Sequence, residues 1–214
     1  MRRPFVDKIR AAATLEVELG AAIPGEPAMP NATKPTLISG GHKGAEAEFG
    51  RAAKRFGIEQ TTLSFEGHDM EWPVGVRVLS PAELAKGDVS MEIVCRRMGR
   101  TYHHPGRVRS VVQSIFHMVN DAYQVFAIGW IQPDDTVKGG TGWAVELAKL
   151  FNRELYVFDQ ARLDWFAWRG NRWEPAQPSI GDKTFCGTGT RNLTAEGRTA
   201  VGELFERSFA TTAG

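Results

Sequence analysis

Three glycine clusters constrain this 214-residue chain most, because each stands where a short apolar segment gives way to a helical pattern. The clusters are residues 40–44, 139–142 and 187–189. Glycine allows positive φ and close approach of the backbone to a ligand, and the N-terminus of the following helix offers free N–H donors. Carboxyl ends of parallel strands lie along one sheet edge, where α/β proteins bind ligands. The clusters therefore predict a ligand site at such an edge.

The apolar periodicity around the clusters predicts the fold class. Short apolar runs indicate strands at 36–39, 61–65, 76–79, 123–131, 154–158 and 184–186. Apolar residues at helical spacing indicate helices at 44–56, 108–119, 141–151 and 195–209. This alternation is typical of an α/β fold with a Rossmann-like, doubly wound, mainly parallel sheet and helices on both faces. A small hairpin is expected around residues 165–174.

The chain divides at its N-terminal side into an arm and one domain. Residues 1–34 combine a helical pattern at 6–22 with a stretch of three prolines, through which a helix cannot continue. We expect this arm to carry no chemistry and to serve in covering an apolar face or in self-association. Residues 35–214 are expected to form a single ligand-binding domain.

Composition excludes several classes of protein. With 26 Lys and Arg against 25 Asp and Glu, the net charge of +1 excludes a wholly basic DNA-coating protein. The chain shows no secretory signal and no apolar run of the ~20 residues that span a bilayer. Its two cysteines form neither a disulfide framework nor a metal site on their own, and its five histidines lack metal-ligand spacing. We therefore expect a cytoplasmic protein with no membrane association, no metal and no resident cofactor.

The glycine clusters also resemble signatures of a known superfamily. Residues 38–46 (ISGGHKGAE) resemble the SGGARGAD signature of the SLOG superfamily, which includes DprA-like proteins and LOG phosphoribohydrolases. Residues 137–146 (VKGGTGWAVE) resemble the second signature, PGGxGTxxE, and residues 185–194 (FCGTGTRNLT) resemble TGSRDLT. The last signature usually opens the fold but here comes last, so the resemblance implies a circular permutation. It also implies a nucleotide-binding domain that forms a homodimer.

The resemblance assigns roles to individual residues. Glu146 matches the glutamate of the second signature, and Arg107 and Arg109 lie near the family's arginine. In LOG-like enzymes these groups cleave an N-glycosidic bond, so Glu146 and Arg109 are the implied catalytic residues. A surface role that complements the helix dipole is the alternative for Glu146, and equally for Glu46. Trp143 near the family's Gly-Thr position and the absence of a proline before Gly139 depart from the LOG pattern.

The residues expected to bind a ligand or its phosphate come from all three clusters. Lys43 and Arg191 could alternatively be plain surface charges, whereas the fork of a guanidinium suits phosphate. The set is Gly40, Gly41, His42, Lys43, Gly44, Arg107, Gly139, Gly140, Thr141, Gly142, Gly189, Thr190 and Arg191.

Residues 96–109 form the most basic segment of the chain. They include Tyr102 and no acidic residue, and their five arginines are Arg96, Arg97, Arg100, Arg107 and Arg109. Such a segment suits a nucleic acid, with charge for phosphates and a ring for stacking, or a lid over a nucleotide. A solvated loop whose arginines pair with acids elsewhere is the alternative.

Together these patterns predict a protein that binds a nucleotide or nucleoside derivative at the carboxyl edge of its sheet. The enzymatic version of this hypothesis is hydrolysis or ribosyl transfer at an N-glycosidic bond. The alternatives are a nucleotide sensor without catalysis and a DprA-like nucleic-acid-binding protein that uses residues 96–109.

Overall fold

The fold is built on one eight-stranded sheet within the described part of the chain. The computed structural model describes residues 35–102 and 106–210, so the predicted N-terminal arm lies outside the described residues. The strands are β1 (Thr36–Ser39), β2 (Glu59–Ser64), β3 (Val76–Val78), β4 (Gln124–Gly129), β5 (Glu154–Asp159), β6 (Asp164–Arg169), β7 (Arg172–Pro175) and β8 (Phe185–Gly189). The helices are α1 (Ala45–Arg55), α2 (Pro81–Ala85), α3 (Asp88–Arg97), α4 (Arg107–Asn120), α5 (Thr141–Leu150) and α6 (Ala195–Phe209).

The strand order is β3-β2-β1-β8-β4-β5-β6-β7. The six strands from β3 to β5 are parallel, and the β6–β7 hairpin adds two antiparallel strands at the far edge. β8 is last in the chain but lies at the centre of the sheet, where it pairs with both β1 and β4. If β8 is counted as the first strand and the three-residue edge strand β3 is left out, β2-β1-β8-β4-β5 has the 3-2-1-4-5 order of a doubly wound sheet. The predicted α/β, Rossmann-like fold is confirmed.

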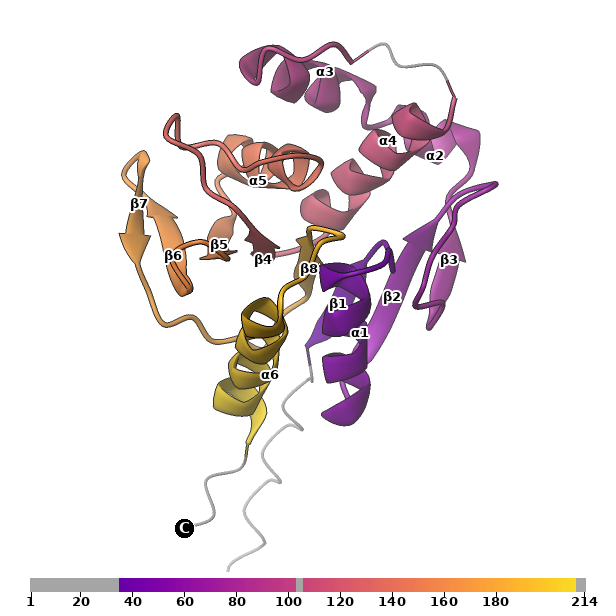
Figure 1. Ribbon diagram of the computed structural model, residues 1–214. Coiled ribbons are helices and arrows are strands. Elements are labelled where there is room, and N and C mark those ends of the chain that lie inside the picture. The colour runs from indigo at the N-terminus through magenta and orange to yellow at the C-terminus, as the bar shows by residue number, and fades with distance from the viewer. Residues whose placement is uncertain (1–34, 103–105, 211–214) are drawn as a thin grey trace, which may run out of the picture. The chain divides into compact units, whose positions relative to one another are not determined.

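Alternating apolar side chains explain why helices cover both faces of the sheet. Leu37 and Phe185 point to the face that α1 and α6 cover, whereas Ile38 and Cys186 point to the opposite face. That opposite face is covered by α4 and α5, on which α3 packs (Figure 1). Because successive side chains of a strand alternate between faces, a strand buried on both sides must be apolar throughout.

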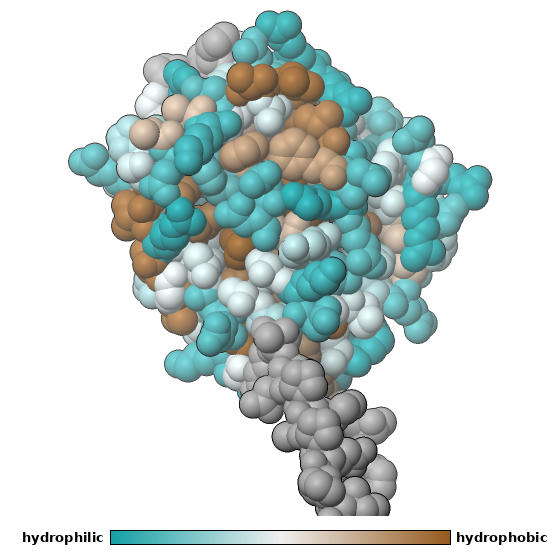
Figure 2. Space-filling model, turned by 180° about the vertical axis from the view of Figure 1, so that it is seen from behind, coloured by the Kyte–Doolittle hydropathy of each residue, from teal (hydrophilic) through white to brown (hydrophobic). Residues whose placement is uncertain are grey.

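Some large apolar side chains are exposed at the surface, including side chains of α3. Val89 and Ile93 of α3 are among the exposed large apolar residues. Figure 2 shows apolar side chains gathered on the upper part of the rear face. Among the residues described, no helix is long and apolar enough to cross a membrane. Both cysteines, Cys95 and Cys186, are buried free thiols.

Candidate functional site

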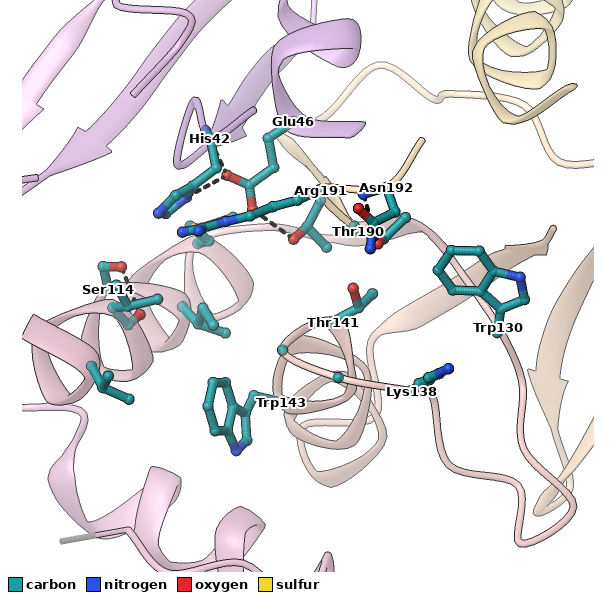
Figure 3. A pocket seen from close by; sticks show the side chains of 18 residues that line it. His42, Glu46, Ser114, Trp130, Lys138, Thr141, Trp143, Thr190, Arg191 and Asn192 are labelled. Atoms are coloured by element: carbon teal, nitrogen blue, oxygen red, sulfur yellow. Dashed lines mark hydrogen bonds and ion pairs between the residues drawn. The ribbon is translucent and has the colours of Figure 1, made fainter. Parts of the chain in front are cut away.

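A cavity of about 550 Å³ opens at the carboxyl ends of the central strands, as the glycine clusters predict. Loops that follow β1, β4 and β8 form one part of its wall, and α4 supplies an aliphatic part (Figure 3). The lining residues are His42, Glu46, Val108, Val111, Ser114, Ile115, Met118, Trp130, Lys138, Gly139, Gly140, Thr141, Trp143, Thr188, Gly189, Thr190, Arg191 and Asn192.

The second and third glycine clusters supply most of the predicted ligand residues that reach this cavity. Gly139, Gly140 and Thr141 line it at the start of α5, and Gly189, Thr190 and Arg191 line it after β8. Gly142 does not line the cavity, and a Cβ there would lie 2.3 Å from the Val137 carbonyl oxygen. Its role is therefore close packing of α5 on the preceding loop.

The first glycine cluster packs against the protein itself. Only His42 of its five predicted residues lines the cavity; Gly40, Gly41, Lys43 and Gly44 do not. The amide of Ala45 donates to the Thr190 carbonyl over 3.0 Å, and the Gly41 carbonyl accepts from the amides of residues 71 and 72. The first of these contacts uses an N–H donor that a phosphate would otherwise need, and the second holds the loop against the segment around residue 72.

A glutamate of the protein occupies the N-terminal end of α1. Glu46 Oε2 accepts from the His42 amide over 3.1 Å and lies 3.0 Å from His42 Nδ1. Glu46 Oε1 accepts from the Thr188 hydroxyl over 2.9 Å. Burial favours the neutral acid, but the hydrogen bonds and the nearby imidazole hold the pKa of Glu46 below its ordinary value. The positive end of this helix is therefore matched by a carboxylate of the chain itself.

A chain of side chains leads from Glu46 away from the cavity. His42 Nε2 lies 2.9 Å from His68 Nε2, and His68 Nδ1 lies 3.3 Å from the Ser64 hydroxyl. If both imidazoles are neutral, one assignment of protons serves every contact: Ser64 donates to His68, His68 to His42, and His42 to Glu46. His68 also stacks on Phe65, with ring centroids 4.5 Å apart. This network fixes the Glu46 carboxylate, and the sequence pattern did not reveal it.

Two cationic side chains line the same cavity. Neither Lys138 nor Arg191 forms an ion pair with another described residue. Lys138 directly precedes the glycines at the start of α5, a ten-residue helix whose N-cap, Gly140, has no side-chain capping hydrogen bond. The positive end of α5 and Lys138 make this part of the cavity suited to an anion, and Arg191 adds positive charge on the side of Glu46 and His42 (Figure 3).

Two indole rings provide the flat surfaces of the cavity. Trp130 follows β4, and Trp143 lies in the first turn of α5; both are half-buried and line the cavity. The Arg100 guanidinium lies 5.4 Å from the centroid of the Trp143 ring and donates to the Gly139 carbonyl over 2.8 Å. Arg100 therefore braces the second glycine cluster. Aromatic walls with a few polar groups are typical of sites for flat organic ligands.

The structure places Glu146, the glutamate of the second signature, outside the cavity lining. Its carboxylate is buried and accepts from Lys149 Nζ over 2.8 Å. Lys149 Nζ in turn lies 3.8 Å from the centroid of the Trp168 ring in β6. Glu146 therefore belongs to a contact between α5 and the β6–β7 hairpin, and the carboxylate that lines the cavity is Glu46.

The arginines of the basic segment are distributed among separate contacts. Arg109 pairs with Asp88 over 2.8 Å and does not line the cavity. Arg96 pairs with Glu92 over 2.5 Å, at the end of the helix α3, which the sequence did not predict. Arg97 is exposed, and the side chain of Arg107 lies outside the described residues. The segment thus includes arginines that pair with acids, the alternative considered for it.

Comparisons with known proteins add little to this picture. No protein-family model matches the sequence, and no curated protein matches it. Among solved structures, the chain is similar to a crystal structure from Syntrophus aciditrophicus described as a "Putative molybdenum carrier protein". The two are 13% identical with a TM-score of 0.48, over 81% of this chain and 94% of the other. The inference about function therefore rests on the cavity and on its residues.

Proposed function

We propose that this protein binds a nucleotide or nucleoside derivative in the cavity at the carboxyl ends of β1, β4 and β8. The observation that carries the proposal is the pairing, within one cavity, of indole walls with unpaired cations. Trp130 and Trp143 suit a base, Lys138 and the N-terminus of α5 suit a phosphate, and Arg191 adds a cation on the opposite side of the cavity. A volume of about 550 Å³ lies within the range of small-molecule sites.

Binding without an assigned reaction is the function that the geometry supports best. The hydrolase hypothesis placed Glu146 at the ribose, but Glu146 lies outside the cavity lining and pairs with Lys149. The nucleic-acid hypothesis relied on residues 96–109, yet Arg96 and Arg109 pair with acids of α3. A nucleotide sensor therefore agrees best with the contacts observed.

Calorimetric titration of the full chain with AMP, GMP, CMP and UMP tests this proposal. We expect binding of at least one of them, and about a tenfold loss of affinity in Lys138→Ala and in Arg191→Ala, because each removes a charge-assisted contact to phosphate. Lys183→Ala is the matched control, since exposed Lys183 precedes β8 at the opposite edge of the sheet, and it should bind like the wild type.

Two results would overturn the proposal. One is the absence of binding of all four nucleotides by the folded wild-type protein. The other is equal affinity in the wild type and in both cavity variants, which would place the anion elsewhere. Titration with a single-stranded oligonucleotide in parallel separates nucleic-acid binding, which should weaken steeply with salt if it occurs.

A further inference from the structure

One wall of the cavity presents two hydrogen-bond acceptors side by side. Glu46 Oε1, from the first turn of α1, lies 2.9 Å from Thr188 Oγ1, near the end of β8. Both residues line the cavity, and both are buried, with 7% and 3% of their surfaces exposed. The pair therefore brings together two elements that are 142 residues apart in the chain.

The hydrogen bonds already present determine what this pair can still accept. A carboxylate offers about four lone-pair sites. Oε2 of Glu46 receives two hydrogen bonds from His42, and Oε1 receives one from Thr188, so one site remains on Oε1. The Thr188 hydroxyl gives its only proton to Glu46 and keeps lone pairs of its own. The pair can thus accept from a ligand but has no proton left to donate.

The charge of Glu46 also decides where the parts of a nucleotide can lie. The low pKa of its carboxyl keeps it ionised near neutral pH, so a phosphate placed beside it would be repelled. Figure 3 shows Glu46, His42 and Arg191 on one side of the cavity, and Thr141, Lys138 and Trp143 on the other. A ligand that spans the cavity would therefore meet Lys138 and the N-terminus of α5 at one end, and the two acceptors with Arg191 at the other.

We propose that Glu46 and Thr188 bind two adjacent hydroxyl groups of the ligand, so that the site selects a ribonucleotide through its 2′- and 3′-hydroxyls. This inference rests on the proposed nucleotide binding. Adjacent hydroxyls supply two donors at neighbouring positions, which is what two neighbouring acceptors require. A deoxynucleotide would leave a buried acceptor unpaired, and this carries a cost in free energy.

The surrounding residues hold the acceptor pair in place. A Cβ at Gly40 would lie 2.8 Å from Glu46 Oε2, so glycine leaves room for the carboxylate. The chain from His42 through His68 to Ser64 fixes its orientation from behind. A site whose acceptors are fixed before the ligand arrives loses little entropy on binding.

Titration of the full chain with matched nucleotides tests the inference. The ligands are the ribonucleoside 5′-monophosphate that binds best among AMP, GMP, CMP and UMP, and its 2′-deoxy and 3′-deoxy forms. We expect each missing hydroxyl to lower the affinity about tenfold or more, because one partner of the pair is charged. Equal affinity for all three forms would overturn the inference and leave nucleotide binding standing. Absence of binding by any nucleotide would overturn the proposed function itself.

Variants of Thr188 test whether Glu46 and Thr188 are the residues that bind the two hydroxyls. Thr188→Val keeps the volume of the side chain and removes its hydroxyl. We expect this variant to bind the ribonucleotide more weakly than the wild type does. It should bind the deoxy form that lacks the hydroxyl facing residue 188 with the same affinity as the ribonucleotide. Thr188→Ser keeps the hydroxyl and should keep the discrimination, which separates hydrogen bonding from packing. If folded Thr188→Val still discriminates against both deoxy forms as the wild type does, the hydroxyls are read elsewhere. If it does not fold, discrimination in Glu46→Gln decides in the same way.

Discussion

At the residue scale, two glutamates that each follow a glycine cluster in the sequence have different contacts in the structure. Glu46 and Glu146 both lie in a helix that follows a glycine cluster, but Glu46 is in the first turn of α1 whereas Glu146 is in the middle of α5. Glu46 bonds to His42 and Thr188 at the cavity, whereas Glu146 pairs with Lys149 under the Trp168 ring. A signature match gives the type and the spacing of a residue, but only the packed structure shows which side of the helix faces the ligand.

We expect loss of Lys149 to lower stability and loss of the Glu146 charge to leave binding unchanged. The side chains of Glu146 and Lys149 are 11% and 10% exposed, so Lys149→Met leaves a nearly buried carboxylate without its partner. Breaking such a pair costs about 3 kcal/mol of the free energy of unfolding, measurable by urea denaturation. Glu146→Gln should keep the nucleotide affinity of the wild type in calorimetry.

The exposed Glu196 at the start of α6 offers a control for this prediction. Glu196→Gln should leave affinity unchanged and lower the free energy of unfolding by no more than about 1 kcal/mol, because it removes a carboxylate from the first turn of α6. Loss of nucleotide binding in folded Glu146→Gln would instead return Glu146 to the ligand, as the resemblance to the LOG signature implies.

At the element scale, the junction between α1 and the loop after β8 depends on one glycine. Gly44 has φ of 95°, and a Cβ there would lie 2.5 Å from the Thr190 carbonyl oxygen. The same carbonyl accepts from the Ala45 amide, so the two loops cannot separate without loss of a hydrogen bond. The third glycine cluster is therefore held in place by the first.

Comparison of two glycine substitutions measures this contact. Gly99 has φ of 62°, and a Cβ there would meet nothing within 4 Å, so Gly99→Ala should cost about 1 kcal/mol for left-handed strain alone. Gly44 has φ of 95° and ψ of −125°, a conformation that only glycine adopts readily. Gly44→Ala therefore combines a larger backbone strain with a backbone clash, and it should cost about 3 kcal/mol or more of unfolding free energy in urea. Equal losses in the two variants would show that the loops yield without cost.

Some elements of the fold and of the cavity could be predicted from the sequence, and others could not. Short apolar runs and helical spacing predicted the parallel sheet and the hairpin, because both patterns reflect local burial. The glycine clusters predicted the edge on which the cavity lies. They missed α3, whose apolar face is short, and the link from Glu46 through His42 to His68, which depends on residues 26 apart. One feature could have indicated three further cavity residues: a position near the carboxyl end of a central strand, which is shared by Lys138, Trp130 and Thr188. Residue types and spacing cannot show which backbone groups neighbouring loops already use.

At the scale of the whole molecule, the position of β8 indicates that the fold does not depend on the order in which its elements follow one another along the chain. β8 completes the centre of the sheet although it comes last, and the described ends of the domain, at β1 and α6, lie at the same end of the sheet (Figure 1). A chain that begins near β8 should therefore reach the same fold, because the contacts of the sheet do not depend on where the chain is opened.

A permuted chain tests this directly. It would begin at Lys183, continue through Gly214 to Met1 and end at Asp182; residues 182 and 183 form an exposed bend before β8, so the cut breaks no strand. We expect far-ultraviolet circular dichroism, a cooperative thermal transition and nucleotide affinity like those of the natural order. The matched control is opened between Ala127 and Ile128, inside the buried strand β4, and should lose the transition. If the chain that begins at Lys183 fails in the same way, β8 must form early with its preceding segments, and the order of elements would then be part of what specifies the fold.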